Sequence, residues 1–403
     1  MVAPLLRFTE FTDDWEETTL ENLAEVERGK FSVRPRNDPR YFGGEMPFVQ
    51  TGDVAGSDMY LKGYSQTLNA DGIKVSKVFP ADTILITIAA NIGDTTITRY
   101  VVACPDSVVA IQSKKDKANT IFLKNLIDLQ KEVLDSQATQ NAQKNINLQV
   151  LKPLELFAPS IEEQTKIAAF LSAVDEKISQ LSQKHVLLSQ YKQGMMQKLF
   201  SQQIRFKADD GSEFGEWEDK PLNEIASKRS GKNKDGSISE VLTNSATQGI
   251  IKQSDYFERE IVTESNLNGY YIVNLDDFVY NPRISVHAPV GPIKRNKKCL
   301  GVMSPLYTVF TVSEGNLAYL EYFFDSNFWH DYVKGVANSG ARHDRMNITN
   351  KDFFDMPIFY PCLEEQTKIA NFLSSIDQKI EVVAQQIEQA KTWKKGLLQQ
   401  MFV

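Results

Sequence analysis

The sequence predicts an α+β protein in which two related globular domains are joined by two long helices that form an antiparallel coiled coil with pseudo-two-fold symmetry. Three observations support this fold class. A 17-residue segment recurs 202 residues later with 13 identical positions, and each copy continues into a heptad-patterned stretch. The sequence that precedes each copy alternates short β-rich runs with turn signals. The predicted parts are a first domain at 1–160, a central helix at 161–201, a second domain at 202–361 and a C-terminal helix at 362–403.

The repeated segment lies at Glu162–Ile178 (EEQTKIAAFLSAVDEKI) and at Glu364–Ile380 (EEQTKIANFLSSIDQKI). A proline stands before each copy, at Pro159 and Pro361, and an acidic pair opens each copy. Both features are signals of a helix start. Because each copy runs on for about 40 residues, each helix should be roughly 60 Å long.

Apolar residues continue along both copies at alternating spacings of four and three, which is typical of a coiled-coil seam. The same pattern would suit the core of a helical bundle. We expect instead that the two helices pair with each other, because a duplicated pair can bury both seams in a pseudo-symmetric way. The predicted seam residues are Ile167, Leu171, Val174, Ile178, Leu181, Leu188, Ile369, Leu373, Ile376, Ile380, Val383 and Ile387.

The two ends of the chain resemble a continuous segment. Leu5-Leu6-Arg7-Phe8 near the N-terminus is similar to Ile204-Arg205-Phe206, which follows the central helix. The N-terminus would thus continue the C-terminal helix in a circular arrangement. We predict that the two termini lie close together.

The regions that precede the two long helices are expected to be two diverged copies of one α+β domain. In both, β-rich runs separated by turn signals precede a helical run. These runs are Phe79–Ile97, Tyr100–Gln112 and Thr120–Ser136 in the first domain, and Tyr270–Tyr280, Val302–Val312 and Asn316–Val336 in the second.

The composition is that of an ordinary globular protein, with 42% hydrophobic and 24% charged residues. No apolar run approaches the ~20 residues that span a bilayer, and the N-terminus lacks the apolar core of a secretory signal. The three scattered cysteines suit reduced thiols and neither a disulfide framework nor a zinc cluster. We therefore expect a cytoplasmic protein without a membrane partner.

The charge distribution does not by itself indicate nucleic-acid binding. The net charge is −7, and each domain carries −4, from 17 basic against 21 acidic residues in 1–160 and from 18 against 22 in 202–361. Nucleic-acid-binding proteins usually show a basic footprint. Basic clusters nevertheless occur at corresponding places, after Gly29 and around Gly231. One such cluster is more often solvated surface, and its repetition raises the odds of a DNA contact modestly.

No catalytic or metal-binding motif is recognisable. The sequence contains no phosphate-binding loop of the GxxxxGK[ST] type, no GxGxxG, no HExxH and no Cys/His set with metal-ligand spacing. Asn281-Pro282-Arg283-Ile284 departs from the Asn-Pro-Pro-aromatic signature of adenine methyltransferases and is interpreted as a turn.

The repeated motif closely resembles that of the specificity (S) subunit of type I restriction–modification enzymes. The matching pattern is Ile161-Glu162-Glu163-Gln164, then Lys166-Ile167-Ala168, Phe170-Leu171 and Asp175, and it recurs from Pro361. The lead-in to each domain, Arg7-Phe8 with Trp15 and Arg205-Phe206 with Trp217, also fits the family.

The resemblance implies a non-catalytic subunit. Each domain would be a target-recognition domain that reads one half of a bipartite, asymmetric double-stranded DNA target, and the helices would act as a spacer. Two methylation (M) subunits, and restriction (R) subunits, would dock on the chain. S-adenosylmethionine, ATP and Mg are expected on those partners, and no cofactor or metal on this chain.

Candidate DNA contacts follow from charge and loop placement. They are Lys30, Arg34, Arg36, Arg40 and Tyr41 in the first domain, and Lys228, Arg229, Lys232, Arg283, Lys294, Arg295, Arg342 and Arg345 in the second. Two alternatives remain open. One is a coiled-coil scaffold that binds proteins and has no DNA role, and the other is a DNA-recognition subunit of a different modification or nuclease system.

Overall fold

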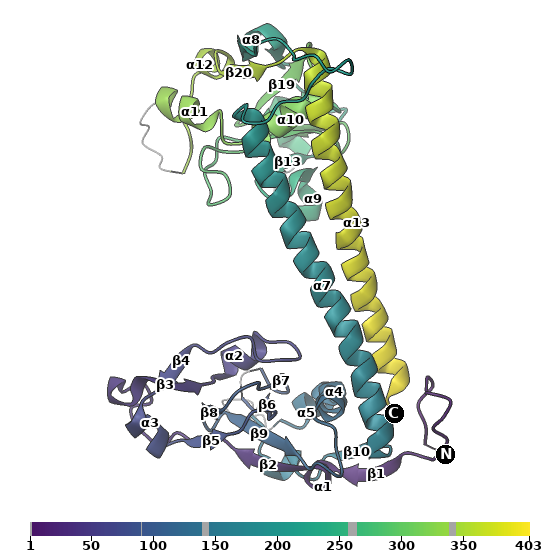
Figure 1. The fold of residues 1–403 in the computed structure, drawn as a ribbon. Helices are drawn as coiled ribbons and strands as arrows, with labels where there is room; N and C mark the ends of the chain where they lie inside the picture. Colours follow the sequence, from purple (N-terminus) through teal and green to yellow (C-terminus); the bar gives the residue numbers. More distant parts are fainter. Residues whose placement is uncertain (1, 90, 139–144, 257–263, 338–343) are drawn as a thin grey trace. The chain divides into compact units, whose positions relative to one another are not determined.

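Figure 1 shows the computed structural model, which describes residues 2–89, 91–138, 145–256, 264–337 and 344–403. The chain forms two compact units. One comprises Met1–Ser182 with Gln385–Val403, and the other comprises Gln183–Ala384. Each unit therefore holds one globular domain together with one end of both long helices. Within the described ranges, no helix combines the length and hydropathy that a membrane span requires.

The first domain is built on a four-stranded antiparallel sheet of order β2-β9-β6-β7, formed by Ala24–Arg28, Val108–Ser113, Ile84–Thr87 and Thr95–Ile97. Both faces of this sheet are covered. Ile84 and Ile86 pack into the core that includes the long helices, whereas Leu85 between them packs into a second core with Val102. Successive side chains of a strand point to opposite faces, so a continuous apolar run is needed here.

The second domain repeats this sheet. Its strands run in the order β12-β19-β16-β17, formed by Ala226–Lys228, Thr308–Val312, Phe278–Tyr280 and Ile293–Arg295. Small two-stranded sheets flank both versions, β1 with β10 (Glu16–Thr19, Glu155–Ala158) and β11 with β20 (Glu218–Pro221, Pro357–Tyr360). Gly93 and Gly291 enter β7 and β17 with φ of +84° and +82°, a conformation that favours glycine. The prediction of one diverged α+β domain is confirmed.

The two domains differ in what lies beyond this common sheet. The first adds a second four-stranded sheet, β4-β3-β8-β5, from Gln66–Leu68, Phe42–Phe48, Val102–Cys104 and Lys77–Phe79. The second has two antiparallel strand pairs, the hairpin β13–β14 (Leu242–Ser245, Gly249–Lys252) and the pair of β15 with β18 (Tyr271–Val273, Gly301–Met303). The predicted β-rich runs Tyr270–Tyr280 and Val302–Val312 therefore each contribute strands to two sheets.

Short helices connect these strands. In the first domain they are α1 (Leu20–Leu23), η1 (Pro39–Tyr41), α2 (Thr51–Ala55), α3 (Ala70–Lys74), α4 (Thr120–Leu129), α5 (Lys131–Ser136) and α6 (Leu148–Leu151). In the second they are α8 (Leu222–Ile225), α9 (Gln253–Tyr256), η2 (Glu264–Gly269), α10 (Leu317–Asp325), α11 (His330–Val336) and α12 (Asn350–Phe354). Each predicted helical run thus consists of two helices, α4 with α5 and α10 with α11.

The long helices are α7 (Ile161–Phe200) and α13 (Leu363–Met401), and they run antiparallel. In one unit, the Lys394 ammonium lies 2.6 Å from the Asp175 carboxylate. In the other unit, Lys192 lies 2.7 Å from Asp377. The two lysines are equivalent in the repeat, and so are the two aspartates. The same contact is therefore made twice with the helices exchanging roles, as pseudo-two-fold symmetry requires.

The predicted seam residues fall into two groups. Eight are buried: Ile167, Leu171, Val174, Leu181, Ile369, Leu373, Ile376 and Val383. The other four, Ile178, Leu188, Ile380 and Ile387, are half-buried. The buried residues nearest each helix start also belong to a domain core, because Ile167 and Leu171 pack in the same cluster as Trp15 and Phe122. The start of each helix is thus part of a globular domain as well as of the helix pair.

The two ends of the chain meet, as predicted. The Leu6 amide donates to the Gln400 carbonyl oxygen at 2.8 Å. At the corresponding place in the repeat, the Ile204 amide donates to the Lys198 carbonyl oxygen at 3.2 Å. The N-terminal segment therefore takes the position after α13 that the continuous chain takes after α7.

Candidate nucleic-acid interface

The glutamate of the repeated motif anchors each domain to a long helix. Glu163 accepts hydrogen bonds from Arg7 Nε and Nη2 at 2.8 and 2.7 Å, and Trp15 Nε1 lies 3.4 Å from the same carboxylate. The hydrogen bond to Glu163 raises the pKa of Arg7. Because the carboxylate is buried, its charge requires these partners. Arg205, Trp217 and Glu365 repeat the arrangement.

The glutamine that follows holds the start of a domain helix. Gln164 Oε1 accepts from the Asn119 amide at 3.0 Å, and its Nε2 donates to the Pro159 carbonyl oxygen. Gln366 does the same with Asn316 and Pro361. Asn119 and Asn316 are the N-caps of α4 and α10. The repeated Glu-Gln pair thus holds each domain on its long helix, and the polar groups of both side chains are used in these contacts.

In the first domain, the predicted DNA contacts surround η1. Arg36 pairs with Asp106 at 2.8 Å, and Arg40 pairs with Asp38 at 2.6 Å. The hydrogen bond from Arg40 lowers the pKa of Asp38. Tyr41 is half-buried against Phe31, so its ring supports the loop. These arginines can reach a phosphate only by leaving exposed ion pairs, which contribute little.

Lys30 and Arg34 differ from these neighbours. Both are exposed, and among the described residues neither has a carboxylate partner. Arg34 donates to two backbone carbonyl oxygens, that of Val33 at 2.8 Å and that of Phe31 at 3.4 Å. Of the contacts predicted in the first domain, these two side chains can bind a phosphate without first breaking an ion pair.

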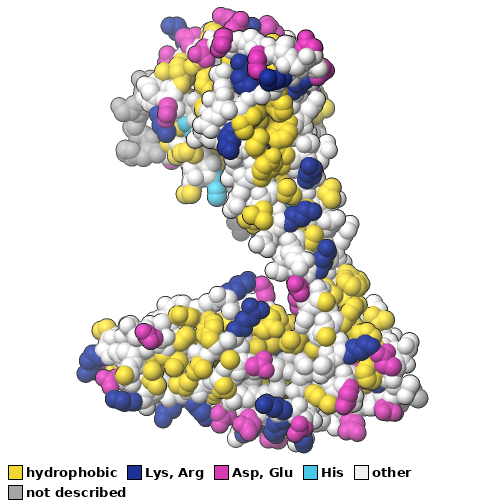
Figure 2. Space-filling view, viewed as in Figure 1, with side chains coloured by type: hydrophobic (Ala, Val, Ile, Leu, Met, Phe, Trp, Pro, Cys, Tyr) yellow, Lys and Arg dark blue, Asp and Glu magenta, His cyan; other side chains and the backbone are white. Residues whose placement is uncertain are grey.

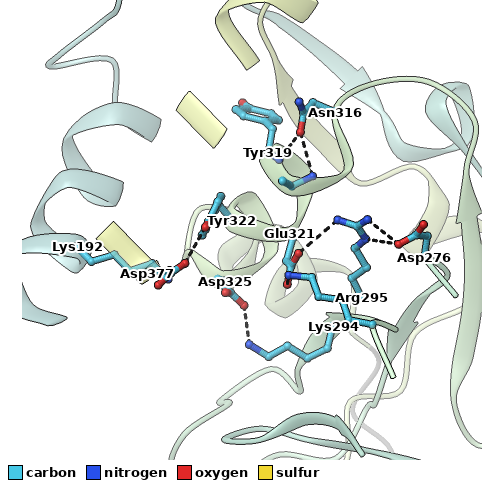
Figure 3. A network of polar contacts seen from close by, with 12 residues as sticks. Lys192, Asp276, Lys294, Arg295, Asn316, Tyr319, Glu321, Tyr322, Asp325 and Asp377 are labelled. Atoms are coloured by element: carbon cyan, nitrogen blue, oxygen red, sulfur yellow. Dashed lines mark hydrogen bonds and ion pairs between the residues drawn. The ribbon is translucent and has the colours of Figure 1, made fainter. Parts of the chain in front are cut away.

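In the second domain, Lys294 and Arg295 on β17 are already paired (Figure 3). Lys294 lies 2.5 Å from Asp325, and Arg295 lies 2.6 Å from Asp276 and 3.7 Å from Glu321. Three carboxylates therefore neutralise this basic pair. A phosphate group would have to displace them before it could bind here.

The adjoining side of α10 contacts the long helices of the same unit. Tyr322 donates its hydroxyl to Asp377 at 2.7 Å, and Lys192 lies on the same carboxylate (Figure 3). Burial raises the pKa of Tyr322, so the hydroxyl keeps the proton that it donates. α10 thus links the β17 cations to the helix pair.

The other predicted residues of this domain are more varied. Arg229 pairs with buried Asp277 at 2.6 Å, and Lys228 donates to Asn350 at 3.0 Å. Lys232 and Arg283 are exposed and have no carboxylate partner in the described part of the chain. Arg345 lies 3.6 Å from Asp344. Arg342 falls outside the described residues.

Arg283 and Arg345 line a polar hollow of about 540 Å³. The other lining residues include Ser245, Ser304 and Tyr307, which the sequence analysis missed. Ser245 ends β13, whereas Ser304 and Tyr307 lie in one turn after β18, and none of the three carries a charge. The Asn281-Pro282-Arg283 segment, which the sequence indicates to be a turn, forms another part of the wall.

Cations form no continuous patch on the face that Figure 2 shows. Lys and Arg occur there in small groups with Asp and Glu between them. The DNA contacts predicted from the sequence therefore stay predictions. Those without a carboxylate partner are free to bind a phosphate, whereas the others would first have to leave an ion pair.

Both long helices also expose an aromatic residue at the same repeat position. Tyr191 is 51% exposed and Trp393 is 54% exposed. Trp393 borders a groove of about 380 Å³ together with Val174, Leu181 and Ala390. Exposed aromatic residues beside apolar grooves are typical of protein interfaces.

Comparison with known proteins gives a consistent picture. The family model of the type I restriction modification DNA specificity domain matches the chain twice, at residues 12–188 and 215–392. The putative type I restriction enzyme MjaX specificity subunit of Methanocaldococcus jannaschii is 26% identical, over 96% of this chain and 93% of its own length.

Solved structures share the fold. The S subunit of a type I restriction-modification system from M. genitalium has a TM-score of 0.57 and 14% identity, with 100% of this chain and 99% of that chain covered. A chain from a structure described as the basis of complex assembly and conformational transition of the type I R-M system has a TM-score of 0.56 and 15% identity, covering 95% and 96%. The predicted fold class is confirmed by this likeness.

Proposed function

The chain belongs to the type I restriction modification DNA specificity family, and from this premise we propose that it reads a bipartite, asymmetric double-stranded DNA target, one half-site per domain. As a specificity subunit it confers DNA sequence specificity within a complex. It is not the catalytic subunit of such a system. The scaffold alternative without a DNA role is not favoured, since both domains match a DNA specificity domain.

The observation that carries the proposal is a shared scaffold with different outer elements. Both domains use the same four-stranded sheet and the same glutamate anchor, Glu163 or Glu365. Beyond it, one has the β4-β3-β8-β5 sheet and the other has the β13–β14 and β15–β18 pairs. Identical domains related by a two-fold would read a palindrome. Two domains that share a sheet but differ in their outer strands would instead read two unrelated half-sites.

The partners that we propose are two methylation subunits, joined by restriction subunits. The repeated exposed aromatics support two equivalent docking places, Tyr191 on α7 and Trp393 on α13. S-adenosylmethionine, ATP and Mg would be bound by these partners, which would carry out adenine methylation and DNA cleavage.

The isolated chain should bind DNA weakly. Its net charge is −7, and six of the thirteen predicted contacts, Arg36, Arg40, Arg229, Lys294, Arg295 and Arg345, already have carboxylate partners. Electrostatic contacts to phosphates dominate DNA affinity. Methylation subunits would therefore have to supply much of the phosphate binding, and tight, salt-resistant binding by the chain alone would count against the proposal.

The test is genome-wide adenine methylation in cells with and without this gene, with the methylation subunit gene expressed in both. We expect one motif to disappear on deletion, consisting of two short half-sites around a fixed gap. An unchanged pattern in cells where the methylation subunit is active would refute the proposal. Loss of a modification other than adenine methylation would favour the alternative of a different modification system.

A further inference from the structure

The polar hollow of the second domain lies at the ends of three strands. Its walls are the turns after β13, β16 and β18, and Arg345 closes one side. All of these residues belong to one compact unit. The hollow is thus a property of the second domain alone.

Two arginines are held together at its edge. Arg283 and Arg345 face each other in an isolated antiparallel β-bridge. The flanking backbone bonds, from the Ile284 amide to the Asp344 carbonyl oxygen and from the Met346 amide to the Pro282 carbonyl oxygen, are both 2.9 Å. Because the backbone fixes both positions, the guanidinium groups are presented from a rigid base.

The hydroxyl groups of the hollow add further donors. Ser245 Oγ accepts from the Thr247 and Gln248 amides, and Ser304 Oγ accepts from the Leu306 amide. A hydroxyl that accepts a hydrogen bond still has its own hydrogen to donate. Tyr307, whose hydroxyl lies 3.1 Å from Thr243 Oγ1, is a further hydrogen-bonding group of the wall.

No carboxylate appears among the described residues that line the hollow. This is notable in a domain with 22 acidic and 18 basic residues. The Lys294 and Arg295 pair, by contrast, faces three carboxylates. One carboxylate, that of Asp344, lies 3.6 Å from Arg345 outside the lining. The hollow therefore offers an anionic or acceptor-rich group two arginines and several hydroxyl donors with a single competing acid beside them.

We propose that this hollow binds acceptor atoms of the DNA half-site read by the second domain. The acceptors are phosphate oxygens or the O6 and N7 atoms of guanine, since arginine and hydroxyl donors suit both. The inference rests on the proposed DNA-specificity function and adds the location and chemistry of one contact.

The first domain supplies an internal comparison. Its equivalent bridge joins Ala89 and Asn145, with the Ile146 amide donating to the Ile88 carbonyl oxygen at 3.0 Å. The same backbone arrangement thus exists without either arginine. The arginine pair is consequently specific to the second domain, as a half-site contact should be when the two half-sites differ.

This comparison supplies the test variants, Arg283→Ala and Arg345→Asn, which install the first-domain residues. The full chain is assembled with its methylation subunits, and the methylated motif is mapped for the wild type and for each variant. Lys334→Gln, in an exposed ion pair on α11, is the matched control.

We expect both variants to affect the same half-site. If the arginines read a base, that half-site becomes degenerate at one position, and affinity for the wild-type motif falls roughly 10- to 100-fold. If they bind phosphate, affinity falls for all sequences, and the slope of log K against log salt drops by about 0.9 per contact. Modified duplexes separate the two cases. 7-Deazaguanine removes the guanine N7 acceptor and a methylphosphonate removes one phosphate charge, each at one position at a time. A modification at the contacted position should weaken binding by the wild type and should not weaken binding by the variant that has lost the contact.

Unchanged motif, affinity and salt slope in both variants overturn the inference, and so does a change in the other half-site. A wild-type complex without any bipartite motif instead refutes the proposed function itself. Tyr307→Phe, which removes one hydroxyl and keeps the ring, provides a third variant if either arginine change lowers the yield of assembled complex. The proposal for the hollow is also contradicted if Tyr307→Phe changes neither motif nor affinity and the wild type binds every modified duplex as tightly as the unmodified one.

Discussion

Glu365 accepts two hydrogen bonds from the guanidinium group of Arg205, at 3.1 and 2.8 Å, and its side chain is completely buried. Glu163 makes the same pair with Arg7 in the other unit. The repeated motif therefore marks the joint between each domain and its helix. This explains why the motif survives in both copies although the domains have diverged.

Glu365→Gln should destabilise the protein by about 3 kcal/mol, because it leaves the Arg205 charge without its partner. Urea unfolding followed by tryptophan fluorescence, to which Trp217 beside Glu365 contributes, measures the effect. Glu364→Gln, at the exposed neighbouring position, is the control and should change stability by less than about 0.5 kcal/mol. Equal effects of the two variants would contradict the anchoring role.

Truncation of the exposed helix aromatics should weaken partner binding and leave the fold intact. Tyr191→Ala and Trp393→Ala should each reduce binding of one methylation subunit by about 2 kcal/mol, the size of an interface hot spot. Native mass spectrometry should show loss of one partner copy in each single variant and of both in the double variant. Lys395→Ala, an exposed change on α13, should retain both copies. Retention of two copies by the double variant would place the docking surface elsewhere.

Gly291→Ala should destabilise the second domain by roughly 2 kcal/mol or more. Gly291 has a φ of +82°, and a Cβ there would collide with the Asn281 carbonyl oxygen. Both the strained backbone and the collision lie beside the hollow, so DNA specificity in one half-site should suffer as well. Thermal unfolding measures the loss. Gly215→Ala, where a Cβ meets open space, should be close to neutral.

The three thiols should react in a defined order. Burial raises the pKa of Cys104 to about 12, so at pH 8 almost none of it is the reactive thiolate, and reagents cannot reach it. Cys362 is exposed and Cys299 is half-buried. With DTNB we expect Cys362 to react first and Cys104 only after unfolding. Cys362→Ser should remove the fast phase, and a fast phase that persists would show this order to be wrong.

Much of the architecture could be derived from the sequence. The Glu162–Ile178 repeat and the heptad spacing established the duplication, the two long helices and their pairing, since these patterns are local and repeat at a fixed offset. The similar segments around Arg7 and Arg205 were enough to predict that the termini meet. Identity at a fixed spacing is visible without knowing any contact.

The availability of each basic residue was decided by the tertiary structure. Lys294 and Arg295 form a basic cluster in sequence, yet folding brings Asp276, Glu321 and Asp325 against them. The hollow likewise gathers three turns around Arg283 and Arg345, which are 62 positions apart in the sequence. Charge pairing and concave surfaces depend on distances between residues remote along the chain. Sequence periodicity determined the frame of this protein, whereas three-dimensional packing decided which side chains on that frame are free to bind.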